Sequence, residues 1–300
     1  MNASAAERPG RLAVGVVGAG RVGSVLGSAL AMAGHTVVAT SGVSDDSRRR
    51  AEHHLPGVPL VEPTEVIARS DLVLLTMPDD ALPEFVTGLV ATDTDVKGTL
   101  LVHTSGRYGV GVLDPLTRLG ALPIAAHPVM TFTGRPEDVD RLAGCAFGVT
   151  APDALRPIAE TLVVEMGGEP SWVTEDRRGL YHAALAGGAN HLVTLVAESA
   201  QLLRASGVEE PGRMLGPLLG AALDNALRLG MSGLSGPVVR GDAGTVASHV
   251  GELRDVSTEA TSAYVAMARL TADRALAEGL LSPADAERLL EVLAGPGAHQ

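Results

Sequence analysis

The chain has 300 residues, of which 46% are hydrophobic, and its formal net charge is −12 at pH 7. This length is sufficient for two domains, since a domain usually has about 100–150 residues. The acidity argues against nucleic acid or an anionic membrane as a partner, and the single cysteine, Cys145, excludes an internal disulfide and a multi-cysteine metal site.

The first eleven residues, MNASAAERPGR, contain no apolar run of the kind that a secretory signal carries. We interpret residues 1–11 as a disordered tail. Nowhere does the sequence reach the roughly 20 uninterrupted apolar residues that a membrane-spanning helix needs. We therefore expect a cytoplasmic protein without membrane contact.

A strand, a glycine-rich loop, a helix and a second strand follow the tail. Residues 12–17 form a continuous apolar run, as a strand buried on both faces does, and the loop after it has the G-x-G-x-x-G pattern. The helical pattern ends at Gly34, and residues 35–41 form the second strand. This order is typical of a Rossmann dinucleotide-binding unit. The residues expected to bind the pyrophosphate are Gly18, Ala19, Gly20, Arg21, Val22 and Gly23.

Strands and helices continue to alternate up to residue 174, and only helices are predicted after it. The further strands are expected at residues 71–78, 98–106, 122–132, 145–151 and 169–174. The later helices are expected at about residues 176–205, 209–231, 242–253, 255–278 and 283–294. The fold class is thus α/β, with a doubly wound parallel sheet in a Rossmann domain at 12–174 and an all-helical domain at 175–300. Clefts between such domains are preferred binding sites.

The end of the second strand indicates which nucleotide binds. An NAD-specific domain usually has an acidic residue there, whereas this sequence has Ser41 and Ser44, with arginines at 48–50 just downstream. Hydroxyls and arginines favour the 2′-phosphate of NADP over NAD. Asp45 and Asp46 leave NAD open, and the arginines are also compatible with a solvated helix face.

The third strand ends in TMPDDAL, at the edge of the sheet where ligands bind. Thr76 and Pro78 are expected to shape the loop beside the cofactor. Asp79 or Asp80 is equally suited to cap the helix that follows.

Three histidines lie where chemistry is expected. His103, with Ser105, lies at the end of the fourth strand, His127 lies at the end of the fifth, and His182 lies on the first helix of the second domain. His182 and Asn190 share one helical face, since residues i, i+4 and i+8 lie close in angle. Beside a cofactor motif, such histidines indicate acid–base chemistry, although each is also compatible with a satisfied core position.

The stretch SGPVVRGD supplies a basic side chain for a substrate carboxylate. Arg240 is expected to bind the carboxylate, with Asp242 orienting it or capping the next helix. Arg107 is a second candidate. A metal site is not expected, because the histidines lack carboxylates at ligand spacing.

The order of the motifs GAGRVG, TMPDDAL, VHTSG, AHPVMTF, YHAALAGGANHLV and GLSGPVVRGD resembles a family of Rossmann-like proteins whose C-terminal half is a domain of unknown function. That family is related to ketopantoate reductase, 6-phosphogluconate dehydrogenase and pyrroline-carboxylate reductase. The resemblance implies reduction of ketopantoate or a similar acid. Ketopantoate reductases carry Lys-x-x-x-Asn-x-x-x-Asn on the equivalent helix, where this chain has His182, Ala186 and Asn190.

We therefore expect an NADP-dependent reductase of a small 2-oxo acid. His182 would donate the proton, Asn190 and Ser105 would bind the carbonyl oxygen, and Arg240 and His103 would bind the substrate. The His-Pro pair at 127–128 is similar to the motif of prephenate dehydrogenases, so a hydroxy-acid dehydrogenase centred on His127 is the alternative. A non-catalytic NADP-responsive protein is a third reading. The Ala- and Leu-rich helices predict a homodimer through the helical domain.

Overall fold

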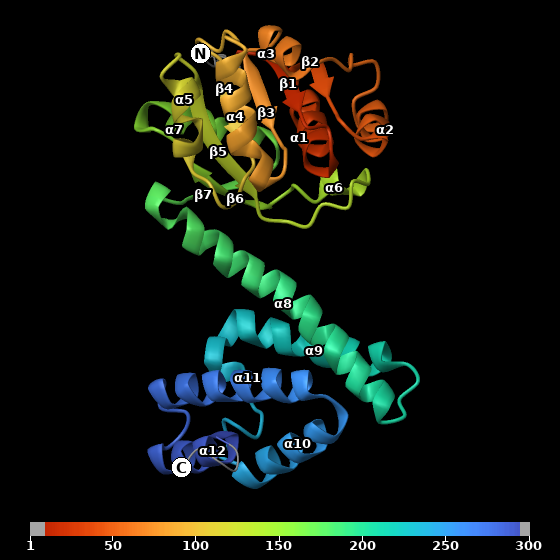
Figure 1. The fold of residues 1–300 in the computed structure, drawn as a ribbon, viewed down its shortest axis with the longest axis vertical. Helices are drawn as coiled ribbons and strands as arrows, with labels where there is room; N and C mark the ends of the chain where they lie inside the picture. The colour runs from red at the N-terminus through yellow and green to blue at the C-terminus, as the bar shows by residue number, and fades with distance from the viewer. Residues whose placement is uncertain (1–9, 295–300) are drawn as a thin grey trace, which may run out of the picture. The chain divides into compact units, whose positions relative to one another are not determined.

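The computed structural model describes residues 10–294, which divide into two compact units, one up to Gly187 and one from Gly188 onward. The expected tail at 1–11 lies almost wholly outside the described residues. The first unit contains one seven-stranded sheet in the order β2-β1-β3-β4-β5-β6-β7 (Figure 1). The sheet ends well before Gly187, so the first unit also includes the start of helix α8 (Arg178–Ala205).

The elements of the first unit follow the predicted order closely. The strands are β1 (Ala13–Val17), β2 (Thr36–Ser41), β3 (Leu72–Leu75), β4 (Leu100–His103), β5 (Leu122–Pro128), β6 (Ala146–Thr150) and β7 (Glu169–Trp172). The α-helices are α1 (Arg21–Met32), α2 (Asp45–His54), α3 (Pro63–Ala68), α4 (Leu82–Ala91), α5 (Asp114–Thr117), α6 (Glu137–Asp140) and α7 (Arg156–Glu165). Short 3₁₀ helices include η1 (Asp79–Ala81), η2 (Val110–Leu113) and η4 (Glu175–Arg177).

The sheet is buried on both faces, which explains the unbroken apolar runs of its central strands. Successive residues of β3 enter opposite cores. Leu72 and Leu74 pack with side chains of α1 and α7, whereas Val73 and Leu75 pack with side chains of α3, α4 and α5. A strand with helices on both sides has no solvent face, so its sequence does not alternate.

The sheet is mostly parallel, as expected, but it departs from that arrangement at β6. Strands β1 to β5 pair in parallel, but β5 pairs with β6 antiparallel, and β7 is parallel to β6. The connection from β5 to β6 contains only α6, a helix of 4 residues. A parallel return needs a crossover that spans a face of the sheet, usually a full helix. The chain therefore turns back beside β5, and α7 then makes the crossover to β7.

The second unit is all-helical, as predicted. It contains the rest of α8, α9 (Pro211–Leu229), α10 (Ala243–Val256), α11 (Thr258–Ala277) and α12 (Pro283–Ala294). Its apolar core is formed by α10, α11 and α12. By contrast, α9 buries only Pro211 and Leu215, and α8 buries only Arg178. Among residues 10–294, no helix combines the length and apolarity that crossing a membrane requires.

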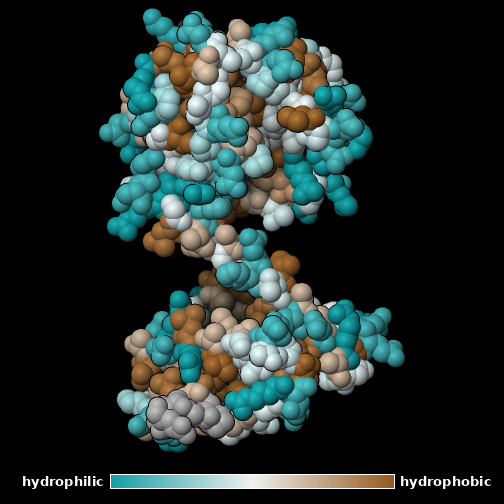
Figure 2. Space-filling model, in the orientation of Figure 1, coloured by the Kyte–Doolittle hydropathy of each residue, from teal (hydrophilic) through white to brown (hydrophobic). Residues whose placement is uncertain are grey.

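Apolar side chains are exposed along α8 and α9, and brown patches on the helical unit in Figure 2 show surface of this kind. The exposed set on these two helices comprises Leu180, Leu192, Val193, Leu195, Met214, Leu218, Leu223, Leu227 and Leu229. Helices of a globular protein normally bury such a face. Within residues 10–294, these apolar faces of α8 and α9 are therefore left exposed.

Candidate active site

The glycine-rich loop lies at the carboxyl end of β1, where the strand order reverses between β2 and β3. Ligands bind at such a reversal in open α/β sheets. The backbone N–H groups of Gly18 and Ala19 donate to the Ser41 carbonyl, at 3.2 and 2.8 Å, and Gly18 has a φ of +93°. Helix α1 begins with no side-chain cap and no acidic residue in its first turn. Its first N–H groups and its dipole therefore suit an anion.

Gly23 and Thr76 fix the conformation of this loop. The Thr76 hydroxyl donates to the Gly18 carbonyl at 2.6 Å and to the Val17 carbonyl at 3.2 Å. A Cβ at Gly23 would overlap both the Thr76 hydroxyl and the Gly18 carbonyl oxygen. Thr76 thus acts beside the predicted cofactor site by holding the loop, while Pro78 is exposed at the N-cap of η1.

The end of β2 has no acidic side chain. Ser41 is buried there, and Ser44 caps α2 by accepting a backbone N–H at 3.1 Å. Arg49 pairs with Asp46 on the surface of α2. Arg48 is exposed and joins no ion pair within residues 10–294. The region could therefore offer hydroxyls and one uncommitted guanidinium to a nucleotide.

His127 and His182 come together beside Gly106. The Nδ1 atom of His127 lies 2.9 Å from the Tyr181 hydroxyl, and the rings of His127 and His182 are 6.1 Å apart between centroids, at 86°. A Cβ at Gly106 would lie 2.6 Å from His182 Cδ2 and 3.0 Å from His127 Nε2. The two histidines therefore flank a buried backbone position that only glycine can occupy without displacing them.

The protonation of His127 follows from its surroundings. Burial lowers the pKa of His127 to about 4, and the positive charge of Arg178 and the neighbouring His182 act in the same direction. Asp79 opposes them. His127 is therefore neutral at pH 7 and carries one N–H.

His103 is the last residue of β4, Ser105 lies in the turn that follows, and both are buried. Nε2 of His103 donates to the Gly109 carbonyl at 2.9 Å, and its Nδ1 accepts the N–H of Ser105 at 3.3 Å. Burial lowers the pKa of His103 to about 4. The Ser105 hydroxyl accepts the Tyr108 N–H at 3.1 Å. The contacts of both ring nitrogens order this turn, in a position where the sequence predicted substrate contact.

Arg178 is the main residue that sequence reasoning missed. The residue is only 1% exposed, and its guanidinium donates to the carbonyls of Tyr108 and Gly148, each at 2.9 Å, and to that of Ser105. Burial lowers its pKa, although it is still a cation at neutral pH. Its only sequence signal is a position one helical turn before His182.

Glu175 was missed as well. Its carboxylate accepts the N–H groups of Val110 and Gly111, at 2.8 and 3.0 Å, and so caps η2. A side chain at Gly109 would overlap this carboxylate. Glu175 and Arg178 together hold the segment from Ser105 to Gly111 against the start of α8.

The remaining predicted residues, Asn190 and Arg240, belong to the second unit. Asn190 is exposed on α8. Arg240 donates to the Ser235 carbonyl, within its own loop. Asp242 caps α10 by accepting the N–H of Thr245 at 3.0 Å, the capping role that the sequence allowed.

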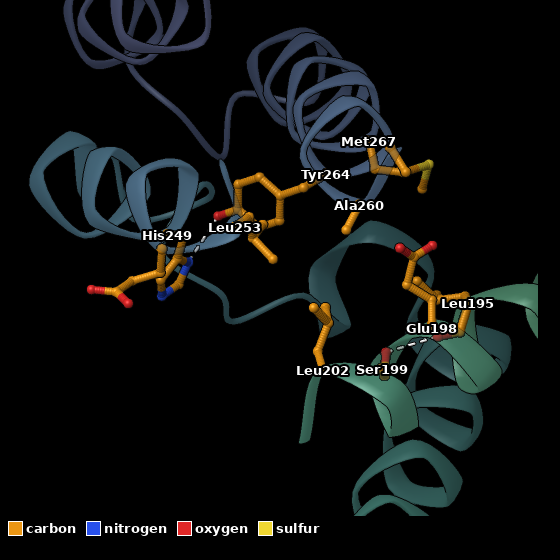
Figure 3. Close-up of a pocket in the computed structure, with 11 residues that line it drawn as sticks. Leu195, Glu198, Ser199, Leu202, His249, Leu253, Ala260, Tyr264 and Met267 are labelled. Carbon is orange, nitrogen blue, oxygen red and sulfur yellow. Dashed lines mark hydrogen bonds between the residues drawn. The ribbon is translucent and has the colours of Figure 1, made fainter. Parts of the chain in front are cut away.

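The helical unit has a cavity of its own, of about 410 Å³, between α8, α10 and α11 (Figure 3). Its lining is mostly apolar. On one side of the cavity, Nδ1 of His249 and the Tyr264 hydroxyl share a hydrogen bond of 2.9 Å. Figure 3 shows Leu195 and Leu202 of α8 facing this pair. Across residues 10–294, no cluster of three or more His, Cys, Asp or Glu side chains is arranged to hold a metal.

Two families match the chain in succession. A Rossmann-like domain matches residues 1–128, and a domain of unknown function, DUF2520, matches residues 145–271. These matches confirm the resemblance that the motifs indicated. None of the curated proteins compared with the chain matches it.

Solved structures share the fold of this chain. A candidate NADP oxidoreductase from Bacteroides fragilis is 19% identical, with a TM-score of 0.72 over 88% of this chain and 98% of its own. An imine reductase from Myxococcus stipitatus in complex with NADP⁺ is 18% identical, with a TM-score of 0.61 over 93% and 99%. A pyrroline-5-carboxylate reductase from Coxiella burnetii is 15% identical, with a TM-score of 0.54 over 91% and 100%.

Proposed function

We propose that this chain, which is built from a Rossmann-like domain followed by a DUF2520 domain, is an NADP-dependent reductase of a small 2-oxo acid. One observation carries the proposal. The glycine-rich loop and the His127–His182 pair lie at the same carboxyl edge of one sheet, within one compact unit. That edge is where α/β sheets bind nucleotide and substrate together.

The residues at this edge fit a dinucleotide. The nearest atom to a Cβ at Gly20 would be 3.8 Å away, so the loop surface there is open, and the uncapped start of α1 suits the pyrophosphate. Ser41 and Ser44 would lie near the ribose, and Arg48 would bind the 2′-phosphate. Two of the similar structures are a candidate NADP oxidoreductase and an imine reductase with NADP⁺ bound, which supports this choice. When bound, NADPH supplies the hydride that reduces the substrate carbon.

His182 is the proposed proton donor to the substrate oxygen. It lies against Gly106 beside His127, and no side chain within residues 10–294 forms a hydrogen bond with it. An imidazole can act as a general acid near neutral pH. The roles predicted for Asn190, Ser105 and Arg240 are part of the same proposal, and an increase in KM on their replacement would test them.

A second substrate class is supported by the similar structures, which include an imine reductase and a pyrroline-5-carboxylate reductase. Reduction of a C=N bond needs the same hydride and a proton on nitrogen. Hydroxy-acid oxidation by His127 receives less support, because an imidazole with a pKa of about 4 is a weak base at pH 7.

The test is the loss of NADPH absorbance with a panel of 2-oxo acids, led by ketopantoate, and a panel of cyclic imines, with NADH run in parallel. Turnover of one acid supports the proposal. Turnover of an imine but of no acid contradicts 2-oxo acid reduction and favours C=N reduction instead. NADPH binding with no turnover supports the non-catalytic reading.

His182→Ala then tests the proton donor. Loss of a general acid costs about 10²–10⁴-fold in rate, so kcat should fall by that factor while the Kd for NADPH stays unchanged. Unchanged kcat would contradict the assignment.

We also propose a homodimer formed through the helical unit. The apolar side chains of α8 and α9 are exposed, with Leu218 at 65% and Leu227 at 79%, and the 410 Å³ cavity beside α8 is apolar too. Packing against the same helices of a second copy of the chain is the simplest way to bury these exposed apolar side chains. Light scattering should give twice the chain mass, and a monomer would refute the proposal.

A further inference from the structure

Two histidine–tyrosine pairs in this chain have nearly the same geometry. His127 and Tyr181 have ring centroids 5.7 Å apart at 90°, and His249 and Tyr264 have centroids 5.7 Å apart at 84°. In each pair Nδ1 lies 2.9 Å from the hydroxyl. Only the first pair lies beside a buried arginine. This difference determines what the first pair can do.

The surroundings indicate which partner donates in the first pair. His127 is neutral, so one of its two nitrogens lacks a proton and can accept. Burial raises the pKa of Tyr181, and the charge of Arg178, whose guanidinium carbon lies 5.4 Å from the Tyr181 ring centroid, opposes this effect only in part, so the phenol keeps its proton at pH 7. Within residues 10–294 the Tyr181 hydroxyl forms its hydrogen bond with Nδ1 of His127, so the phenol proton is available for that nitrogen.

The proton of His127 is then on Nε2. That atom faces Gly106, because it is 3.0 Å from the position that a Cβ at Gly106 would take. Glycine leaves this N–H uncovered by a side chain. The edge of His182 lies on the same side of Gly106. A group bound there could receive a hydrogen bond from His127 and a proton from His182.

We propose that Tyr181 is a positioning residue: its hydroxyl donates to Nδ1 of His127 and holds the ring as the tautomer whose Nε2–H faces the space beside Gly106. There the N–H donates to the oxygen or nitrogen of the substrate's double bond. This role rests on the proposed reductase function. A neutral imidazole can polarise a carbonyl as a hydrogen-bond donor, and one such donor is worth about 10²–10³-fold in kcat.

The first test observes the tautomer directly and needs no turnover. The full chain is labelled with ¹⁵N-histidine, and the His127 signals are assigned with His127→Gln. At pH 7 we expect a neutral ring with the proton on Nε2. In Tyr181→Phe the Nδ1 acceptor loses its donor, so the two tautomers should mix. Tyr264→Phe is the matched control, because it removes the same bond from His249 and should leave the His127 signals unchanged.

A proton on Nδ1 in the wild type, or His127 signals that do not respond to Tyr181→Phe, would overturn the proposal. If no acid or imine is reduced, the proposed function fails while the spectra still decide the role of Tyr181.

The second test is kinetic and uses the substrate found by the panel. Tyr181→Phe should lower kcat by roughly 2–10-fold, much less than the loss of a whole donor, because a mixed ring still presents Nε2–H in a fraction of the molecules. The Kd for NADPH should stay unchanged and KM should change little. A kcat equal to that of the wild type would overturn the proposal, and so would a loss confined to thermal stability.

Discussion

Replacing Gly23 by alanine separates the packing of the glycine loop from its contact with the cofactor. The new Cβ would overlap the Thr76 hydroxyl and the Gly18 carbonyl oxygen, and it would lie 3.0 Å from Val16 Cγ1. The first two atoms are fixed, because the hydroxyl donates to that carbonyl at 2.6 Å. Insertion of a methyl group into a packed site costs about 1–3 kcal/mol. In a domain of this size, each kcal/mol lowers Tm by about 2–4 °C, so we expect a decrease of about 2–12 °C.

Gly20→Ala is the matched control in the same motif. Its φ of −79° suits any residue, and the nearest atom to the new Cβ would be the Gly18 carbonyl oxygen at 3.8 Å. Its Tm should therefore stay within about 2 °C of the wild type. The second glycine of this motif allows the backbone to approach the pyrophosphate, so the Kd for NADPH should rise about tenfold or more.

Both variants are measured by thermal unfolding, followed by circular dichroism, and by calorimetric titration with NADPH. The expected pattern is a lower Tm for Gly23→Ala and a higher Kd at nearly normal Tm for Gly20→Ala. A Gly23→Ala protein with the Tm and Kd of the wild type would show that the loop relaxes at no cost, which would refute the reasoning from packing.

Two other predictions concern charge. Arg48→Ala should raise the Kd for NADPH by about 10–100-fold and leave the Kd for NADH unchanged, since hydrogen bonds to charged groups contribute about 1.5–3 kcal/mol. Arg49→Ala is the control, because it removes a guanidinium that is already paired with Asp46. An equal rise in the Kd for NADPH in both variants would contradict the assignment. Burial lowers the pKa of His103 from 6.5 to about 4. The unfolded chain therefore binds a proton at His103 before the folded chain does, and the free energy of unfolding decreases as pH falls from 6.5 toward 4. The loss of unfolding free energy approaches about 3 kcal/mol at pH 4, so Tm should fall less between pH 7 and 4.5 in His103→Gln than in the wild type. Parallel curves of Tm against pH would show that His103 does not cause the fall.

Most of the fold was predictable because its signals are local. The apolar run before Gly18, the helical period after it and the turn residues between segments identify elements without reference to the rest of the chain. The direction of β6 is different. It depends on whether the connection after β5 forms a helix long enough to cross the sheet, and four helical residues at α6 leave no periodicity to detect.

The candidate site was predictable where topology alone places a residue. The carboxyl ends of parallel strands share one edge, so the glycine loop and His127 were expected to lie at that edge. Arg178 was not predictable, because its partners are carbonyls of Ser105, Tyr108 and Gly148, distant in the chain and of no particular residue type. A backbone acceptor leaves no trace in the sequence.

The segment formed by η4 and the start of α8 therefore has several roles on nearly one face. Glu175, Arg178 and His182 are three or four residues apart and so follow one another along successive helical turns, with Tyr181 beside them. The carboxylate caps η2, the guanidinium holds three carbonyls, and the phenol contacts His127. A buried cation without a paired carboxylate is costly unless its hydrogen bonds are satisfied. Here the carbonyls satisfy them. Burial lowers the pKa of the neighbouring His127, and the charge of Arg178 acts in the same direction. Lysine could keep the charge at 178 but not the planar set of donors, so the ordering of the loop and the electrostatics of the site depend on the same guanidinium.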